Sequence, residues 1–497
     1  HMERWLALQQ GTPLAQVMGR EFQMPGPSLS GSHLAHDTCF GIETSQQLSF
    51  SGLMLSTLRL DPGRPGAVDD YIQQYLRMLS AHEVGHTLGL RHNFQGSVLR
   101  SPNELHNTTL TRAEGLTSSV MDYFPPNLAP PGITQGDYFP TQIGPYDRLA
   151  IEYGYTDTGA MHPNLEQRTL GDIAQQMSRE GLAYATDEDI FSDLDPQAKP
   201  FDLSSNPMQF AQWQMDNAQD LLQRLDGAYL LPEEGYDELR DRFESAFWYY
   251  ASQVFTLSGY VGGQSFSRQR AGDTAISGRL PFEPVPVEQQ RQALELINTY
   301  VFAADAFQFS PDLINQLAPD RWFHWGSFPV IAPLQYPIYD QVSFLQGFAL
   351  IDLFSSDRLS RLQSASLRNS GDEILGLPEL FSTLQQDIWQ ELSGDGDKAN
   401  ISTLRRGLQR HHLDILSGLV LQNPSQPSSF LELIVALETL YAPEDARVLA
   451  RYQLRQLAGE IQASLARHSA LDVSTRAHLE DSRDRIQQIL NAQRIAG

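Results

Sequence analysis

The sequence predicts a mainly α-helical protein, α+β at most, in which a short histidine-rich segment is followed by a large helical region. After residue 155, apolar residues recur at helical spacing, and breaks containing Pro and Gly separate the runs. Few convincing strands precede the histidine-rich segment. That segment, Ala81–His92, reads AHEVGHTLGLRH. Its pattern and the helical periodicity together determine the predicted fold class.

Length and composition limit the possible architectures and partners. At 497 residues the chain is too long for a single compact core, so we expect at least two domains, residues 1–155 with the histidines and a helical domain at 156–497. A net charge of −25 argues against nucleic acid as a partner and against anionic lipid. No apolar run approaches the roughly 18 residues that suggest a membrane span.

The residues before the histidine-rich segment carry weak signals. Apolar residues between Ile42 and Leu60 fit either one face of a helix or one side of a strand, and we favour a helix. Cys39 is the single cysteine, which excludes an internal disulfide. It fits an inert buried residue better than a thiolate latch on a metal. No signal peptide is visible at the amino terminus.

The helix that bears the first two histidines is predicted to begin near the acidic pair Asp69-Asp70, because acidic side chains favour a helix N-terminus. Residues four apart lie on one helix face, so the imidazoles of His82 and His86 can reach one metal ion. Gly89 permits the left-handed turn that ends a helix. His92 can then arrive as a third ligand.

Three neutral imidazoles with an open position for water are the usual ligands of catalytic zinc. Glu83 follows the first histidine, where a carboxylate can take a proton from metal-bound water. The fixed glycine and third histidine make a chance match rare. The sequence therefore predicts one zinc ion, with Glu83 as the general base. A downstream glutamate, Glu104 or Glu114, is the less favoured alternative for the third ligand.

A second element follows at Ser119–Tyr123, which reads SVMDY and precedes two prolines. Together the two elements resemble the metzincins, zinc peptidases in which a methionine turn lies beneath three histidines. The resemblance implies that Met121 is this methionine. It also implies that Tyr123 can ligate zinc or stabilise the oxyanion of the substrate. The segment Ile143–Tyr155, IGPYDRLAIEYGY, extends the likeness to a bacterial family of large zinc-dependent metalloproteases.

The resemblance implies a peptide or protein substrate and an exported protein, periplasmic or extracellular. Metzincins also place a sheet before the active-site helix, and the residues before His82 show little sign of one. Two hypotheses follow. The chain is a zinc endopeptidase, or it is an incomplete or non-catalytic zinc-binding scaffold that needs an upstream region, a propeptide or a partner chain.

The segments between and after the histidine-rich segment and Ser119–Tyr123 are predicted to form a loop and a helix. Gln95–Ser118 is polar and turn-rich, which predicts a loop. Pro145 is predicted to begin a helix that runs through Tyr153. Asp147 on this helix is placed to hydrogen-bond the methionine turn, although a solvated acid at a helix start fits equally well.

The helical region is predicted to contain nine amphipathic helices and one break. The helices lie near residues 208–229, 233–257, 286–304, 340–355, 378–393, 400–417, 428–440, 444–467 and 472–493. The break, Ser258–Pro286, predicts a hairpin or a long loop. Two acidic clusters lack the spacing of a calcium loop, so solvated loops are favoured over calcium sites. The clusters are Asp187, Glu188, Asp189, Asp193 and Asp195, and Asp395 and Asp397.

Overall fold

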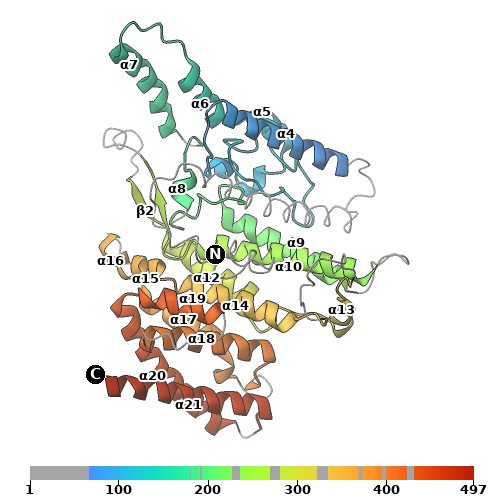
Figure 1. The fold of residues 1–497 in the computed structure, drawn as a ribbon, viewed down its shortest axis with the longest axis vertical. Coiled ribbons are helices and arrows are strands. Elements are labelled where there is room, and N and C mark those ends of the chain that lie inside the picture. Colours follow the sequence, from blue (N-terminus) through green and yellow to red (C-terminus); the bar gives the residue numbers. More distant parts are fainter. Residues whose placement is uncertain are drawn as a thin grey trace, which may run out of the picture. The chain divides into compact units, whose positions relative to one another are not determined.

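The structure is a computed structural model of the chain, with elements labelled as in Figure 1. The residues that it describes are 67–179, 181–190, 193–226, 235–268, 280–321, 334–368, 373–394, 399–421, 430–468 and 470–496. The predictions for Cys39, for residues 42–60, and for Asp395 and Asp397 lie outside these residues.

The chain divides into two compact units. The larger unit comprises Asp69–Ala218, Tyr250–Phe309 and Ile338–Gly497, and it contains the histidine-rich segment. The smaller unit includes Gln219–Tyr249 and Ser310–Pro337. The domain boundary at residue 155 stays a prediction.

Aromatic packing is prominent in the smaller unit. The ring of Phe243 lies parallel to that of Phe247, with centroids 6.3 Å apart, and edge-on to Tyr336 at 5.3 Å. The guanidinium of Arg240 lies 5.0 Å from the centroid of the Tyr336 ring. Such contacts add a directional component to apolar burial.

Helix α4 (Ala67–Thr87) lies in the larger unit from Asp69 onward, and its acidic first turn confirms the predicted start. The loop predicted at Gln95–Ser118 is wrong in part, because it contains α5 (Thr108–Glu114) and two 3-10 turns. The side chain of Asn107 caps α5, and Gly115 ends it at φ +97°. A capped helix this short has no room for a repeating apolar stripe, which is why periodicity missed it.

Helix α6 (Pro145–Tyr155) begins at the predicted proline and is followed by α7 (Pro163–Ala174), which the sequence did not predict. The two helices share a small apolar cluster formed by Leu149, Ile173 and Leu182. The short helix α8 (Asp187–Ile190) follows. Other unpredicted short helices are α13 (Pro311–Gln316), α15 (Ser356–Gln363) and α16 (Ala365–Arg368).

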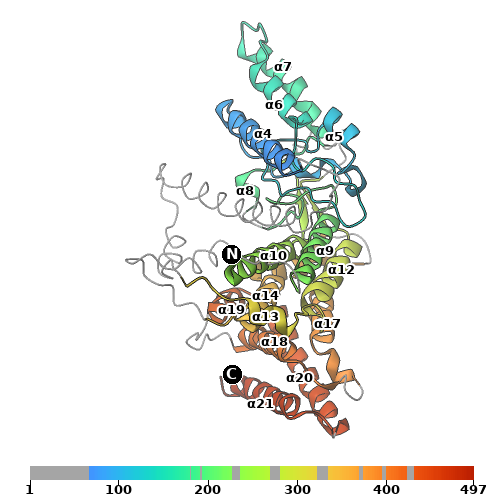
Figure 2. The ribbon, with the colours of Figure 1, turned by 90° about the vertical axis from the view of Figure 1, so that its right-hand side faces the viewer.

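All nine predicted amphipathic helices are present (Figures 1 and 2). They are α9 (Pro207–Leu225), α10 (Tyr236–Ser258), α12 (Val287–Ile297), α14 (Ile338–Leu353), α17 (Leu377–Ile388), α18 (Thr403–Leu421), α19 (Phe430–Leu440), α20 (Glu444–Arg467) and α21 (Val473–Ala496). Helix α18 packs against α14, α19, α20 and α21, and its buried residues belong to the core of the C-terminal bundle. None of the described helices is long and apolar enough to cross a bilayer.

The predicted break contains a hairpin rather than a plain loop. Strand β1 (Gln264–Phe266) pairs antiparallel with β2 (Phe282–Pro284), in the register Ser265 opposite Glu283. Within the described ranges this is the only sheet, so the mainly helical fold class is confirmed.

Candidate metal centre

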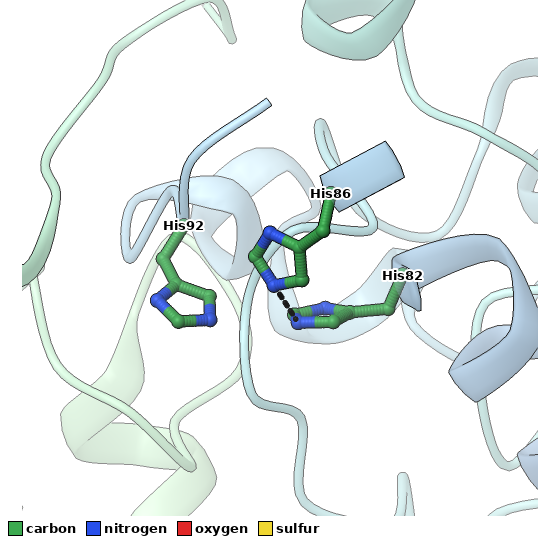
Figure 3. Close-up of side chains that lie close together, drawn as sticks. All are labelled: His82, His86 and His92. Carbon is green, nitrogen blue, oxygen red and sulfur yellow. Dashed lines mark hydrogen bonds between the residues drawn. The ribbon is translucent and has the colours of Figure 1, made fainter. Parts of the chain in front are cut away.

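The C-terminal half of α4 presents two histidines to one point in space (Figure 3). The Nε2 atoms of His82 and His86 lie 3.1 Å apart, as expected for neighbours one helical turn apart. His82 is buried, whereas His86 and Glu83 are exposed. The centre is therefore supported on one side and open on the other.

A Schellman motif ends α4 and turns the chain back. Gly89 adopts φ +88°, in the left-handed region that glycine enters without strain. The amide of Leu90 donates to the carbonyl of Gly85, and the amide of Gly89 donates to the carbonyl of His86, each at 3.0 Å. The predicted turn at Gly89 thus delivers His92 to the exposed face of the helix end.

The three histidines come together as the sequence predicts. One ring nitrogen from each lies within 4.8 Å of those of the other two. Across the described ranges, they form the one group of His, Cys, Asp or Glu side chains close enough to hold a metal ion.

Each of the three rings has its Nδ1 atom engaged away from the centre. Nδ1 of His82 lies 2.8 Å from the carbonyl oxygen of Val120, and Nδ1 of His86 lies 3.0 Å from that of Leu90. Nδ1 of His92 lies 2.8 Å from a carboxylate oxygen of Asp187. Carbonyl oxygens only accept hydrogen bonds, so the proton of each ring is placed on Nδ1 and the Nε2 lone pair faces the centre.

This arrangement suits a cation. With both Nδ1 atoms protonated, the close Nε2 contact between His82 and His86 brings two lone pairs together, and a shared positive ion relieves their repulsion. Burial lowers the pKa of His82 to about 4, which keeps this ring neutral near pH 7. Two nitrogens on a tetrahedral zinc ion with bonds of about 2.05 Å are roughly 3.3 Å apart, close to the observed separation. The donor set therefore fits zinc.

Met121 lies directly beneath α4. Its side chain is fully buried, and a Cβ atom added at Gly85 would overlap its sulfur. Gly85 lies between the two helical histidines, so the absence of a side chain there lets the methionine approach the helix backbone. The carbonyl of Met121 also accepts the amide of Asn93 at 2.9 Å, which connects the turn to the segment that bears His92.

Asp147 ties the Ser119–Tyr123 segment, which contains Met121, to the start of α6. Its carboxylate accepts the hydroxyl of Ser119 at 2.6 Å and the amides of Val120 and Gly144, each at 2.9 Å. Burial raises the pKa of Asp147. Of the two positions considered from sequence, the structure shows the hydrogen-bonded one, and the solvated one is wrong.

Tyr123 also reaches the centre. Its hydroxyl oxygen lies 2.8 Å from Nε2 of His92. Because Asp187 accepts the proton on Nδ1 of that ring, the phenol donates to the Nε2 lone pair in this contact, and a metal ion bound at Nε2 would take its place. The Tyr123 side chain is buried, and its ring packs against Phe94 and Phe201, so the hydroxyl is held on the metal side of the third histidine.

The residues considered as a glutamate ligand lie in other contacts. The carboxylate of Glu104 accepts the amide of Ser101 at 2.9 Å, and that of Glu114 lies 3.3 Å from Arg100. Neither belongs to the group of close ligand atoms. The favoured third ligand is the one that the geometry supports.

Asp187 is the residue that sequence reasoning did not assign to this centre. It was considered for calcium, yet it accepts a hydrogen bond from a histidine 95 positions earlier. No spacing rule connects residues so far apart. The other described acids of that cluster also contact protein groups: Glu188 with Arg91, Asp189 with Arg268, Asp193 with Lys199, and Asp195 with Gln95.

Comparison with known proteins agrees with this centre. The family model described as Met-zincin matches residues 64–396, which is more than half of the chain and includes the centre. No curated protein and no solved structure matches.

Proposed function

We propose that this chain, which belongs to the Met-zincin family, is a zinc-dependent endopeptidase with Glu83 as its general base. The observation that carries the proposal is the set of three Nε2 atoms directed at one point, with every Nδ1 engaged elsewhere. In a histidine cluster that binds no metal, nothing requires all three rings to carry their proton on Nδ1. The exposed carboxylate of Glu83 next to this point adds a group that a purely structural zinc site does not require.

The side chains then have separate roles. His82, His86 and His92 would hold zinc, and the bound ion would lower the pKa of water and polarise a peptide carbonyl. Glu83 takes a proton from the attacking water and returns it to the leaving amine. The Tyr123 hydroxyl, placed beside His92, donates a hydrogen bond to the oxygen that gains charge, an effect worth about 2–4 kcal/mol for one good donor.

The decisive test is Glu83→Gln. The variant should keep its zinc, because Glu83 is not among the three ligands, and should cleave a diverse peptide mixture about 100- to 10,000-fold more slowly. Metal content and cleavage products are measured on the same samples. The matched control is Glu152→Gln, which removes an exposed acid of α6 and should cleave like wild type. Wild-type cleavage rates in Glu83→Gln would refute the proposal.

One observation supports the second candidate, a zinc-binding module that needs an upstream region or a partner chain. Helix α4 leaves about half of each of four large apolar side chains exposed, and exposed apolar surface of this kind marks a place where another segment or chain can pack. They are Val68, Ile72, Leu76 and Val84, of which the first three lie four residues apart on one face of the helix. Zinc in both wild type and Glu83→Gln, with cleavage by neither, would support this candidate. Export of the protein stays a prediction.

A further inference from the structure

The third histidine is held differently from the first two. Helix α4 fixes the backbone of His82 and His86, but His92 lies in irregular chain beyond the Schellman turn. Its ring orientation therefore depends on side-chain contacts. Of the three rings, it alone donates to a carboxylate, whereas the other two donate to backbone carbonyls.

The carboxylate in question is itself held in place. One oxygen of Asp187 faces His92 at 2.8 Å. The other oxygen accepts from the Thr186 hydroxyl and from Arg91, each at 3.2 Å. Arg91 also forms two hydrogen bonds to Glu188, at 2.9 and 2.7 Å. The residues on either side of the contact thus restrict where Asp187 can point.

The backbone that bears Asp187 is joined to the backbone after His92. The amide of Phe94 donates to the carbonyl of Ala185 at 2.7 Å. The buried side chain of Asn93 donates to the carbonyl of Ala183 and accepts the amide of Ala185, each at 3.1 Å. These bonds hold the segment 183–187 against the residues that follow His92. The hydrogen bond between Asp187 and His92 is therefore supported by the fold on both sides.

We propose that Asp187 is a positioning residue of the metal centre, which acts through His92. Its carboxylate keeps the proton of that ring on Nδ1, directs Nε2 to the metal and increases the electron density that the ring can donate. The part of the chain that supports the metal ligands then includes residues 183–190. This inference rests on the zinc site proposed above, but not on peptide cleavage.

The experiment compares Asp187→Ala, Asp187→Asn and Glu188→Gln with wild type. The zinc dissociation constant is measured by competition with a chromophoric chelator, and Co²⁺ absorption spectra report the ligand geometry. Asp187→Ala should bind zinc about 10- to 100-fold more weakly, as removal of a histidine's carboxylate partner typically does. Asp187→Asn should fall between, because an amide oxygen still accepts the Nδ1 proton but has no charge.

Glu188→Gln is the matched control, because it lies on the same short helix, contacts Arg91 and does not touch His92. Its amide oxygen can still accept from Arg91, so its zinc affinity and Co²⁺ spectrum should stay much closer to wild type than those of Asp187→Ala. Equal melting temperatures of the metal-free proteins would show that each variant folds. Unchanged affinity and spectrum in both Asp187 variants, or an equal loss in Glu188→Gln, would overturn the inference. A wild type that binds zinc in this Asp187-dependent way but cleaves no peptide would refute only the endopeptidase.

Discussion

At the scale of single residues, the packing of Met121 against α4 depends on Gly85, the glycine between the two helical histidines. Gly85 is buried on α4, and the sulfur of Met121 occupies the space that any side chain at Gly85 would need. The buried carboxylate of Asp147 accepts hydrogen bonds from Ser119 and Val120, the two residues before Met121. Contacts with α4 and with Asp147 therefore both restrict the position of Met121.

Gly85→Ala tests this packing. The added methyl group must displace Met121 or α4, which should cost about 1–3 kcal/mol of folding free energy and weaken zinc binding. Chemical unfolding and zinc competition measure the two effects. In the double variant Gly85→Ala/Met121→Ala, the methionine sulfur no longer occupies the space beside position 85. The loss of folding free energy should therefore be smaller than the sum of the losses in the two single variants.

The double-mutant cycle supplies the control. Met121→Ala alone should cost about 2–5 kcal/mol, as truncation of a buried methionine does. A favourable coupling of about 0.5–3 kcal/mol between the two changes is expected for residues in contact. Costs that simply add would show that Gly85 and Met121 do not meet.

At the scale of elements, the C-terminal bundle packs around α18 and encloses several polar side chains that hydrogen-bond one another. Nε1 of Trp389 donates to Nδ1 of His412 at 3.1 Å, and the amide oxygen of Gln409 accepts a hydrogen bond from Nε2 of His478 at 2.8 Å. Arg405, also buried, binds the carboxylate of Glu391. Burial lowers the pKa of His412 to about 3, because the charged ring would lose its hydration.

This histidine predicts how stability depends on pH. The unfolded chain binds a proton at His412 near pH 6.5, whereas the folded chain does not until about pH 3. The free energy of unfolding should therefore fall as pH drops below 6.5, by about 2 kcal/mol for this residue at pH 5. Denaturant unfolding of the metal-free protein at pH 7 and pH 5 should show this loss.

His412→Gln should lose correspondingly less stability between the two pH values, since glutamine does not titrate there. Burial also lowers the pKa of His106 and of His478 to about 4, and these two residues contribute equally to the pH dependence of stability in both proteins. The control His162→Gln replaces an exposed histidine and should follow wild type. An identical pH dependence in wild type and His412→Gln would contradict the assignment.

At the scale of the whole molecule, one buried arginine joins distant parts of the larger unit. Arg358 on α15 is fully buried and binds the carboxylates of Asp193 and Asp352, at 3.1 and 3.0 Å. It also donates to the carbonyls of Ser258 and Val261. These partners come from the segment after α8, from α14 and from the turn that precedes the hairpin.

Arg358→Met should therefore be strongly destabilising. The change leaves buried carbonyl oxygens and carboxylates without their donor, and breaking such a buried pair typically costs about 3–5 kcal/mol. Arg291→Met is the matched control, because Arg291 forms a solvent-exposed ion pair with Glu379, and exposed ion pairs contribute little to stability. Chemical unfolding should show a much larger loss in the free energy of unfolding for Arg358→Met than for Arg291→Met. Equal losses would show that burial of Arg358 has no energetic consequence.

Much of the fold could be predicted because its signals are local. The nine amphipathic helices each have enough turns for an apolar stripe to repeat, and Pro145 marks the start of α6. Short helices such as α5 and α8 escaped prediction, since caps rather than periodicity define them. The two-stranded sheet lies in the break for which the sequence allowed a hairpin or a long loop, and its strands of three residues are too short for alternation to decide between the two.

The sequence by itself determined the ligand set of the centre. His82, His86 and the turn at Gly89 depend on helix geometry, which acts over a few residues and is the same in any fold. Only the tertiary structure decided what holds the imidazoles. The carbonyl of Val120 and the carboxylate of Asp187 lie 38 and 95 positions from their histidines, and long-range packing brings them there. Local chemistry therefore predicts the metal ligands, whereas the groups that orient them follow from how the whole chain packs.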